Sequence, residues 1–270
     1  MKSVPHIVDC HCHIYPQKVA ARAVDSISKF YDVPMCEDGT REGLLACHAA
    51  AGVTHAIIFS VATKPNQTAA INEFIAAEVK AAPDHFTGLG TLHAYSDTLE
   101  SDFVHLMELG LRGVKLHPDT QLFAIDDPRA MPIYELCAQA GIPVYFHAGD
   151  RRYHYSNPEN LLPVLEKYPN LSVIAGHMGG YSVWDEAARM LAGAPNLYVD
   201  CSSTMGFMDD GRILSLIRKW GADRVVFGSD FPMWTPKAEL DRLLSLDLTQ
   251  EEKETILYKN ASCLFSLSLD

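Results

Sequence analysis

Short apolar runs alternate with amphipathic stretches along the whole chain. The runs are rich in Val, Ile, Leu and Phe and lack regular polar alternation, which is typical of parallel strands covered on both faces. They predict strands at residues 7–13, 54–60, 86–93, 112–117, 143–147, 172–177, 197–202 and 224–230. Between them, apolar residues recur at helical spacing. This spacing predicts helices at residues 38–51, 66–81, 97–109, 128–140, 158–168, 184–192, 211–220 and 237–246.

This order of strand-then-helix units predicts an α/β fold, a (β/α)8 barrel, with a doubly wound open sheet as the alternative. The connection between residues 13 and 53 is the longest, so we expect a lid or an extra helix around residues 14–40 near the barrel mouth. Residues 250–265 predict one more helix after the eighth unit. Because no Pro/Gly-rich linker or block of charge divides the chain, we expect one domain over residues 1–270.

Composition narrows the class of protein. Hydrophobic residues make up 48% and charged residues 21% of the 270 residues, as in ordinary globular proteins. The net charge of -12 argues against nucleic acid or an anionic membrane as a partner. The N-terminus does not resemble a signal peptide, and the apolar runs are too short to span a bilayer. We therefore expect a cytoplasmic enzyme for a small-molecule substrate, with its 7 cysteines as free thiols.

Polar residue types that bind metals or catalyse reactions stand at the ends of the predicted strands. In chain order they are His13, Ser60, His93, His117, His147, His177, Ser202 and Asp230. In a barrel, the carboxyl ends of the strands form one ring around one mouth, where barrel enzymes keep their active sites. We therefore expect these side chains to meet in space.

The sharpest local motif is Asp9-Cys10-His11-Cys12-His13. Alternate residues of a strand share a face, so we expect His11 and His13 to point the same way and to bind one ion. We expect Asp9 on that same face, and Cys10 and Cys12 on the face toward the helices. A zinc ion bound by both cysteines and both histidines is an alternative that needs a non-extended backbone. A further alternative is that the two histidines are polar strand residues without a ligand.

Several segments resemble the amidohydrolase superfamily, and more narrowly its amidohydrolase-related branch, which includes aminocarboxymuconate-semialdehyde decarboxylase and benzoate-type decarboxylases. They are the motif at 9–13, 113–118 (GVKLHP), 146–147 (FH), 176–180 (GHMGG), 227–232 (FGSDFP) and 256–261 (ILYKNA). The resemblance implies a distorted (β/α)8 TIM barrel with one divalent metal, usually zinc, with manganese, cobalt, iron or nickel as alternatives. It implies His11, His13, His147 and Asp230 as ligands and His177 as the catalytic histidine. Dimers are common in the branch, so a homodimer is one expected assembly.

These residue types support two reactions. A bound divalent metal lowers the pKa of its water to about 7, so our first interpretation is a hydrolase for an amide, lactone or ester-like bond of a small carboxylated substrate. Asp230 would accept the water proton and His177 would polarise the substrate carbonyl. The alternative is a non-oxidative decarboxylase, a carbon–carbon lyase in which His177 or Asp230 protonates the carbon that loses carbon dioxide. A third interpretation is a catalytically inactive metal-binding barrel.

Five more residues are candidates for substrate binding. Lys115 shares parity with His117 and is expected to face the barrel interior. There it would bind a substrate carboxylate, form an internal ion pair or, as the resemblance implies for binuclear members, be carboxylated and bridge two metals. We expect His117 in the pocket, Arg151 as a clamp for a carboxylate, and Tyr181 and Trp234 as pocket walls. A turn, a solvated loop or plain packing is the alternative for each.

Overall fold

The computed structural model describes residues 4–269 and contains strands in two parallel sheets. The strands are β1 Val8–His13, β2 His55–Phe59, β3 Phe86–Gly88, β4 Val114–Leu116, β5 Val144–Phe146, β6 Val173–Ala175, β7 Leu197–Asp200 and β8 Val225–Val226. One sheet has the order β1-β2-β3 and the other β4-β5-β6-β7-β8, and every pair is parallel.

Two seams join the sheets into a closed ring. Between β3 and β4, Gly90 pairs with Val114, and the Lys115 N–H donates to the Gly90 carbonyl at 2.7 Å. Between β8 and β1, Cys12 pairs with Phe231, and the His13 N–H donates to the Phe231 carbonyl at 2.8 Å. The sheets therefore form a distorted barrel, which confirms the predicted (β/α)8 fold and excludes the open sheet.

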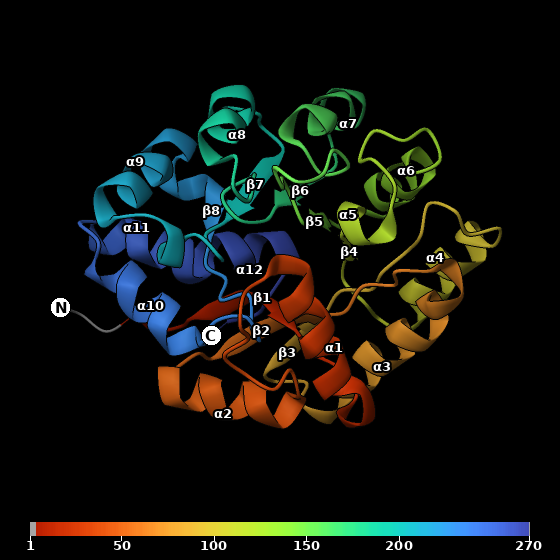
Figure 1. Ribbon diagram of the computed structural model, residues 1–270, viewed down its shortest axis with the longest axis horizontal. Helices are drawn as coiled ribbons and strands as arrows, with labels where there is room; N and C mark the ends of the chain where they lie inside the picture. Colours follow the sequence, from red (N-terminus) through yellow and green to blue (C-terminus); the bar gives the residue numbers. More distant parts are fainter. Residues whose placement is uncertain (1–3, 270) are drawn as a thin grey trace.

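Helices surround the strands (Figure 1). They are α1 Gln17–Tyr31, α2 Arg41–Ala51, α3 Thr68–Ala81, α4 Leu99–Glu108, α5 Pro118–Gln121, α6 Met131–Ala140, α7 Leu162–Lys167, α8 Trp184–Leu191, α9 Asp210–Trp220, α10 Pro236–Ser245, α11 Gln250–Glu254 and α12 Asn260–Phe265. Short 3-10 turns are η1 Pro65–Gln67, η2 Pro158–Leu161, η3 Met205–Phe207 and η4 Ala222–Arg224, and η5 Thr255–Lys259 is a π-helical turn. Each predicted helix is found. The short α5, which follows β4, is not among the predictions.

Local signals explain where several helices begin and end. The Thr40 hydroxyl accepts from the Gly43 N–H at the start of α2, and Gly52 ends that helix with a left-handed φ of 76°. Thr249 and Glu252 form a reciprocal capping box at the start of α11. The predicted helix 250–265 is thus α11, η5 and α12 in succession.

The strands are shorter than the apolar pattern predicts. Pairing in β6 stops at Ala175 and in β8 at Val226, before the polar residues that the pattern placed at the strand ends. His177 and Asp230 instead have left-handed backbones, with φ of 58° and 60°. Non-glycine residues seldom adopt this conformation. Contacts with the rest of the fold must therefore hold both backbones in it.

The first strand contains a bulge that corrects one prediction. Pairing of β1 with β2 shifts register between Asp9 and Cys12, and a bulge reverses the alternation of side chains beyond it. Cys10 consequently packs inside the barrel, while Asp9 faces outward and contacts His48 of α2. The predicted placement of Asp9 inside and Cys10 outside was therefore wrong. Because Cys10 and Cys12 lie on opposite faces, a zinc ion bound by both is also excluded.

Two buried clusters make up the core. The inner one fills the barrel, and its members include Val8, Cys10, Ile57, Phe59, Tyr145, Ile174 and Val226. The larger one lies between strands and helices. The 7 cysteines are free. Within residues 4–269, no helix combines the length and the apolar character needed to cross a membrane.

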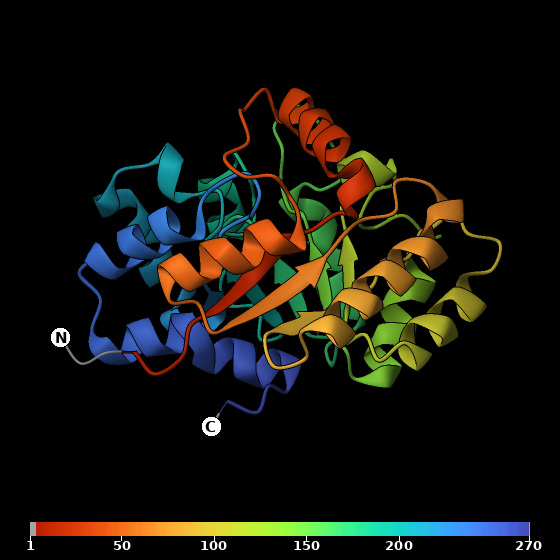
Figure 2. The ribbon, with the colours of Figure 1, turned by 90° about the horizontal axis from the view of Figure 1, so that it is seen from below.

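The long connection after β1 contains α1, which stands at the mouth of the barrel. Figure 2 shows α1 on the side toward which the β1 and β2 arrows point. At its carboxyl end, the Arg152 guanidinium donates to the Phe30 carbonyl and lies 5.4 Å from the Tyr31 ring. This helix therefore covers the carboxyl ends of the strands, where the polar residues gather.

Candidate metal centre

A cavity of about 1000 Å³ opens at the carboxyl ends of the strands. Its floor holds the polar side chains that follow the strands, and its outer wall is the inner face of α1. The floor residues are His11, His13, Lys115, His117, His147, His177 and Asp230. His11 and Asp230 are more than 200 positions apart in the sequence, and the closed barrel brings them together.

His11 lies at the centre of this floor. Its Nε2 is 3.2 Å from Nε2 of His13, 3.3 Å from Oδ1 of Asp230 and 3.3 Å from Nζ of Lys115. Nε2 of His13 is 3.8 Å from the same Asp230 oxygen. The first-strand pair and the eighth-strand carboxylate therefore point at one small volume.

His177 and His147 extend the cluster along the floor. Nδ1 of His177 is 4.0 Å from Oδ2 of Asp230, and the ligand atoms of His11, His177 and Asp230 lie within 4.8 Å of one another. Nδ1 of His147 is 3.0 Å from Nε2 of His177. His147 thus reaches the central group through His177.

This donor set fits a divalent cation. Burial lowers the pKa of His13, His147 and His177, so these imidazoles are neutral at pH 7 and keep a lone pair for an ion. Asp230 adds a carboxylate. Imidazole and carboxylate donors around one point are the ligands that zinc, manganese and related ions prefer.

Asp200, at the end of β7, holds this centre from below and was not found from the sequence. Its fully buried carboxylate accepts from Nδ1 of His11 at 2.9 Å, from the His177 N–H at 3.0 Å and from the Tyr145 hydroxyl. Burial alone would raise its pKa, but these contacts together keep it below the usual range. A carboxylate on Nδ1 leaves Nε2 of His11 directed at the centre.

A second group of possible ligands, made of His117, Asp119 and His147, lies beside the first. The rings of His117 and His147 are stacked, with centroids 4.1 Å apart and planes 6° from parallel. Because an imidazole lone pair lies in the ring plane, two stacked rings cannot direct their nitrogens at one ion. The Tyr31 hydroxyl lies 2.8 Å from Nε2 of His117. The two histidines therefore do not share one ion, and His117 forms a polar wall under α1.

Lys115 lies in the barrel interior, as its parity predicts. Its Nζ is 4.1 Å from the centroid of the Tyr145 ring and 4.7 Å from that of Phe59. Burial lowers its pKa to about 8. Next to His11, Lys115 thus has an ammonium group that loses its proton more readily than that of an ordinary lysine.

The remaining predicted site residues lie at the edge of this region. Trp234 donates its Nε1–H to the Ser203 hydroxyl at 2.9 Å, and that hydroxyl donates to Oδ2 of Asp230. The Tyr181 ring is 6.0 Å from that of His177. Arg151 is exposed and donates to the Ser182 carbonyl at 2.9 Å. None of these three belongs to the described cavity lining.

Two predicted strand-end residues behave differently from each other. Ser60 lines the cavity, where its hydroxyl donates to the Ile14 carbonyl. His93 is outside the lining and packs against Phe123, with ring centroids 5.6 Å apart. His93 is thus a packing residue of the third unit.

The family model described as "Amidohydrolase" matches residues 8–267. The chain therefore belongs to the amidohydrolase family and is a metal-dependent enzyme of that family. Among curated proteins it is 25% identical to gamma-resorcylate decarboxylase of Polaromonas sp. (strain JS666) over 262 residues, covering 76% of this chain and 78% of the relative. It is also 25% identical to 2-amino-3-carboxymuconate-6-semialdehyde decarboxylase of Dictyostelium discoideum over 231 residues, covering 71% of this chain and 64% of the relative.

Solved structures share the fold. An uncharacterized TIM-barrel protein of Bordetella bronchiseptica superimposes with a TM-score of 0.82 at 24% identity, covering 97% of this chain and 98% of that one. A dihydroxybenzoic acid decarboxylase of Polaromonas sp. JS666, solved with manganese and 2-nitroresorcinol, superimposes with a TM-score of 0.73 at 16% identity, covering 97% of both chains.

Proposed function

We propose that this protein is a metal-dependent, non-oxidative decarboxylase of a small aromatic or unsaturated carboxylic acid. The observation that carries the proposal is that two curated relatives are decarboxylases, while His177 and Asp230 face one cavity beside a metal-binding donor set. From the sequence we favoured hydrolysis, although the same ligands suit both reactions. The relatives favour the alternative.

In the proposed site, His11, His13, His147 and Asp230 would hold the cation. Zinc and manganese both suit these donors. The bound cation would supply positive charge that holds the oxygen atoms of the substrate beside its leaving carboxylate. Burial lowers the pKa of His13 and His147, so these two ligands are neutral at pH 7 and do not repel the cation.

Two side chains of the chain would deliver the proton. When the carbon–carboxylate bond breaks, carbon dioxide leaves and the electron pair stays on the ring or chain carbon, which must take up one proton. His177 and Asp230, with Nδ1 and Oδ2 4.0 Å apart, would first take up one proton from water and then deliver it to that carbon. Ser202 fixes the His177 ring, with its Oγ 3.0 Å from Nδ1, and the Ser203 hydroxyl fixes the Asp230 carboxylate.

The cavity would hold such a substrate away from bulk water. Its outer wall is α1, which contributes Val19, Ile27 and Phe30 to the lining. An apolar wall favours a planar aromatic or unsaturated body, and loss of water favours departure of neutral carbon dioxide over a charged carboxylate. Lys115 and His117, which also line the cavity, would bind a further oxygen of the substrate.

The test is product analysis with the manganese- and zinc-loaded protein. Gamma-resorcylate and other hydroxybenzoates should release carbon dioxide, and in D₂O the product should carry one deuterium on the carbon that lost the carboxylate. Asp230→Asn and His177→Gln should each lower kcat by roughly 10²- to 10⁴-fold. Hydrolysis of lactones or N-acyl compounds, with no release of carbon dioxide from any acid of the panel, would contradict the proposal.

A further inference from the structure

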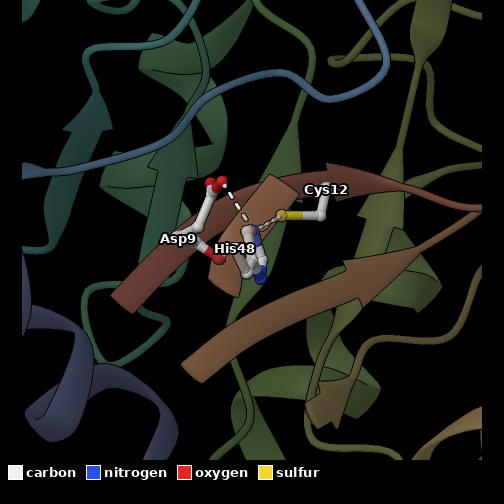
Figure 3. Close-up of side chains that lie close together, drawn as sticks. All are labelled: Asp9, Cys12 and His48. Atoms are coloured by element: carbon white, nitrogen blue, oxygen red, sulfur yellow. Dashed lines mark hydrogen bonds and ion pairs between the residues drawn. The ribbon is translucent and has the colours of Figure 1, made fainter. Parts of the chain in front are cut away.

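A third buried group lies behind β1, outside the cavity lining: Asp9, Cys12 and His48. Figure 3 shows Asp9 and Cys12 projecting from β1 toward His48. Nε2 of His48 is 3.3 Å from Oδ2 of Asp9 and 3.9 Å from Sγ of Cys12. Asp9, Cys12 and His48 are fully buried. The group therefore has a structural or positioning task rather than contact with substrate.

Hydrogen bonds already use the donors and acceptors of this group. An ionised carboxylate only accepts, so Nε2 of His48 donates to Asp9. Nδ1 of His48 is 3.0 Å from Nε2 of His85, a contact in which one ring donates and the other accepts. The Cys12 thiol donates to the Asp9 carbonyl, with Sγ and the oxygen 3.7 Å apart. A metal ion here would have to displace this network.

The other oxygen of Asp9 connects the two segments that carry the proposed metal ligands. Oδ1 accepts from the His11 N–H at 3.2 Å and from the Ser229 N–H at 2.8 Å. His11 lies in the bulge of β1, and Ser229 precedes the left-handed Asp230. Buried backbone N–H groups need a partner, and at these irregular points one carboxylate oxygen supplies it for both.

We propose that Asp9 and His48 are positioning residues that set the geometry and affinity of the metal centre. His48 fixes the Asp9 carboxylate through Oδ2, and Asp9 fixes the backbones of His11 and Ser229 through Oδ1. The ligands of the first strand and of the loop after β8 thereby keep their spacing. This inference rests on the proposed metal site, and it extends that site to a helix, α2, that does not touch the cation.

The experiment is a Co²⁺ titration of the metal-free full-length protein against a competing chelator, recorded by visible absorption. In His48→Phe, which removes the donor, the dissociation constant for Co²⁺ should rise at least about 10-fold and the absorption bands should shift. In His48→Gln, the side-chain amide can donate from nearly the same point as Nε2. This conservative variant should bind Co²⁺ within about threefold of the unmodified protein and restore its spectrum.

Two control variants separate positioning from general destabilisation. His55 is also a buried histidine, at the start of β2, where Nε2 lies 3.0 Å from the Thr87 hydroxyl. His55→Phe should leave the Co²⁺ affinity and spectrum unchanged. Cys12→Ser should do so as well, because the thiol is not a ligand. Circular dichroism of each metal-free variant checks that it is folded.

Unchanged Co²⁺ affinity in a folded His48→Phe, or an equal loss in His55→Phe, would overturn the positioning role. A sulfur-to-cobalt charge-transfer band that disappears in Cys12→Ser would overturn it too, because the group would then be a metal site. If the unmodified protein binds no Co²⁺, the proposed function and this inference both fail. If it binds Co²⁺ but decarboxylates no acid, only the proposed function fails, and the Co²⁺ affinities of the variants still decide the positioning role.

Discussion

Nδ1 of His11 lies 2.9 Å from Oδ2 of Asp200, and both side chains are buried, His11 in the cavity floor and Asp200 beneath it. The two residues belong to the first and seventh strands and are 189 positions apart. Asp200 also accepts from the His177 N–H. One carboxylate therefore orients a proposed ligand and the backbone of a proposed proton donor.

Asp200→Asn should weaken the metal site and also lower the stability of the fold. The amide can accept only through its one oxygen, so at least one donor among His11, Tyr145 and the nearby N–H groups loses its partner. We expect metal affinity to fall about 10- to 100-fold, and the free energy of unfolding to fall by about 3 kcal/mol. Isothermal titration with zinc and urea unfolding measure the two effects. Tyr145→Phe, which removes one donor, should have the smaller effect on affinity, and an equal effect would contradict the central role of Asp200.

Gly228→Ala should disturb the first-strand ligand directly. A Cβ at this position would lie 2.8 Å from Cβ of His11 and 3.4 Å from Cβ of Ser202. Such overpacking in a core costs about 1–3 kcal/mol and moves the neighbour. We expect a lower Tm together with weaker metal binding. Gly52→Ala is a useful comparison, because its Cβ meets nothing within 4 Å but its φ of 76° is left-handed, so it should lower Tm without changing metal affinity.

Glu239 of α10 should make stability depend on pH. Burial, and then the charge of Asp230, raises its pKa to about 8, whereas the unfolded chain has the ordinary value near 4.3. Between these values the folded state holds a proton that the unfolded state has lost. The contribution of Glu239 to the free energy of unfolding is therefore greatest below the lower pKa. It falls as pH rises toward 8, by up to about 1.4 kcal/mol per pH unit.

Glu239→Gln tests this dependence. The neutral amide cannot ionise, so the variant should lose less stability than the unmodified protein when urea unfolding is compared at pH 5 and pH 8. Parallel pH profiles of the two proteins would show that Glu239 titrates normally in the fold.

Arg152→Ala should loosen α1 over the cavity. Arg152 donates to the Phe30 carbonyl and to both oxygens of Asp150, and its guanidinium lies 5.1 Å from the Phe30 ring. Without these contacts we expect faster proteolysis within residues 14–40 and a higher KM, with a smaller change in kcat. Arg129→Ala removes a surface arginine paired with Asp127 and should change neither quantity.

The barrel could be predicted from the sequence because the patterns that indicate its strands and helices are local. Apolar runs mark every strand, and apolar residues at helical spacing mark the helices between them. The cluster at the mouth was predictable for the same reason, since His13, His147, His177 and Asp230 each follow an apolar run. The limits of the strands were not, because the left-handed backbones of His177 and Asp230 arise from long-range contacts rather than from composition.

The supporting residues were harder to predict. Asp200 shares strand parity with Ser202, a signal that could have identified it, but its partner His11 is 189 positions away. His48 sits on an ordinary amphipathic helix, and only the fold shows that it faces Asp9. The bulge in β1 has no sequence signature that distinguishes it from a regular strand, so the faces of Asp9 and Cys10 were exchanged in the prediction.

The seam between β1 and β8 should be the first part of the barrel to open when a bound cation is removed. His11 and His13 belong to the three-stranded sheet, whereas His147 and Asp230 follow strands of the five-stranded sheet. A cation held by all four would tie the two sheets across a seam that depends on few hydrogen bonds, among them Cys10 N–H to the Phe227 carbonyl at 2.9 Å. Chelation should therefore speed deuterium uptake at the Cys10 and His13 amides selectively, while amides within the β5–β6 pair stay protected. The barrel would then open at the seam between β1 and β8 before the hydrogen bonds within either sheet are lost.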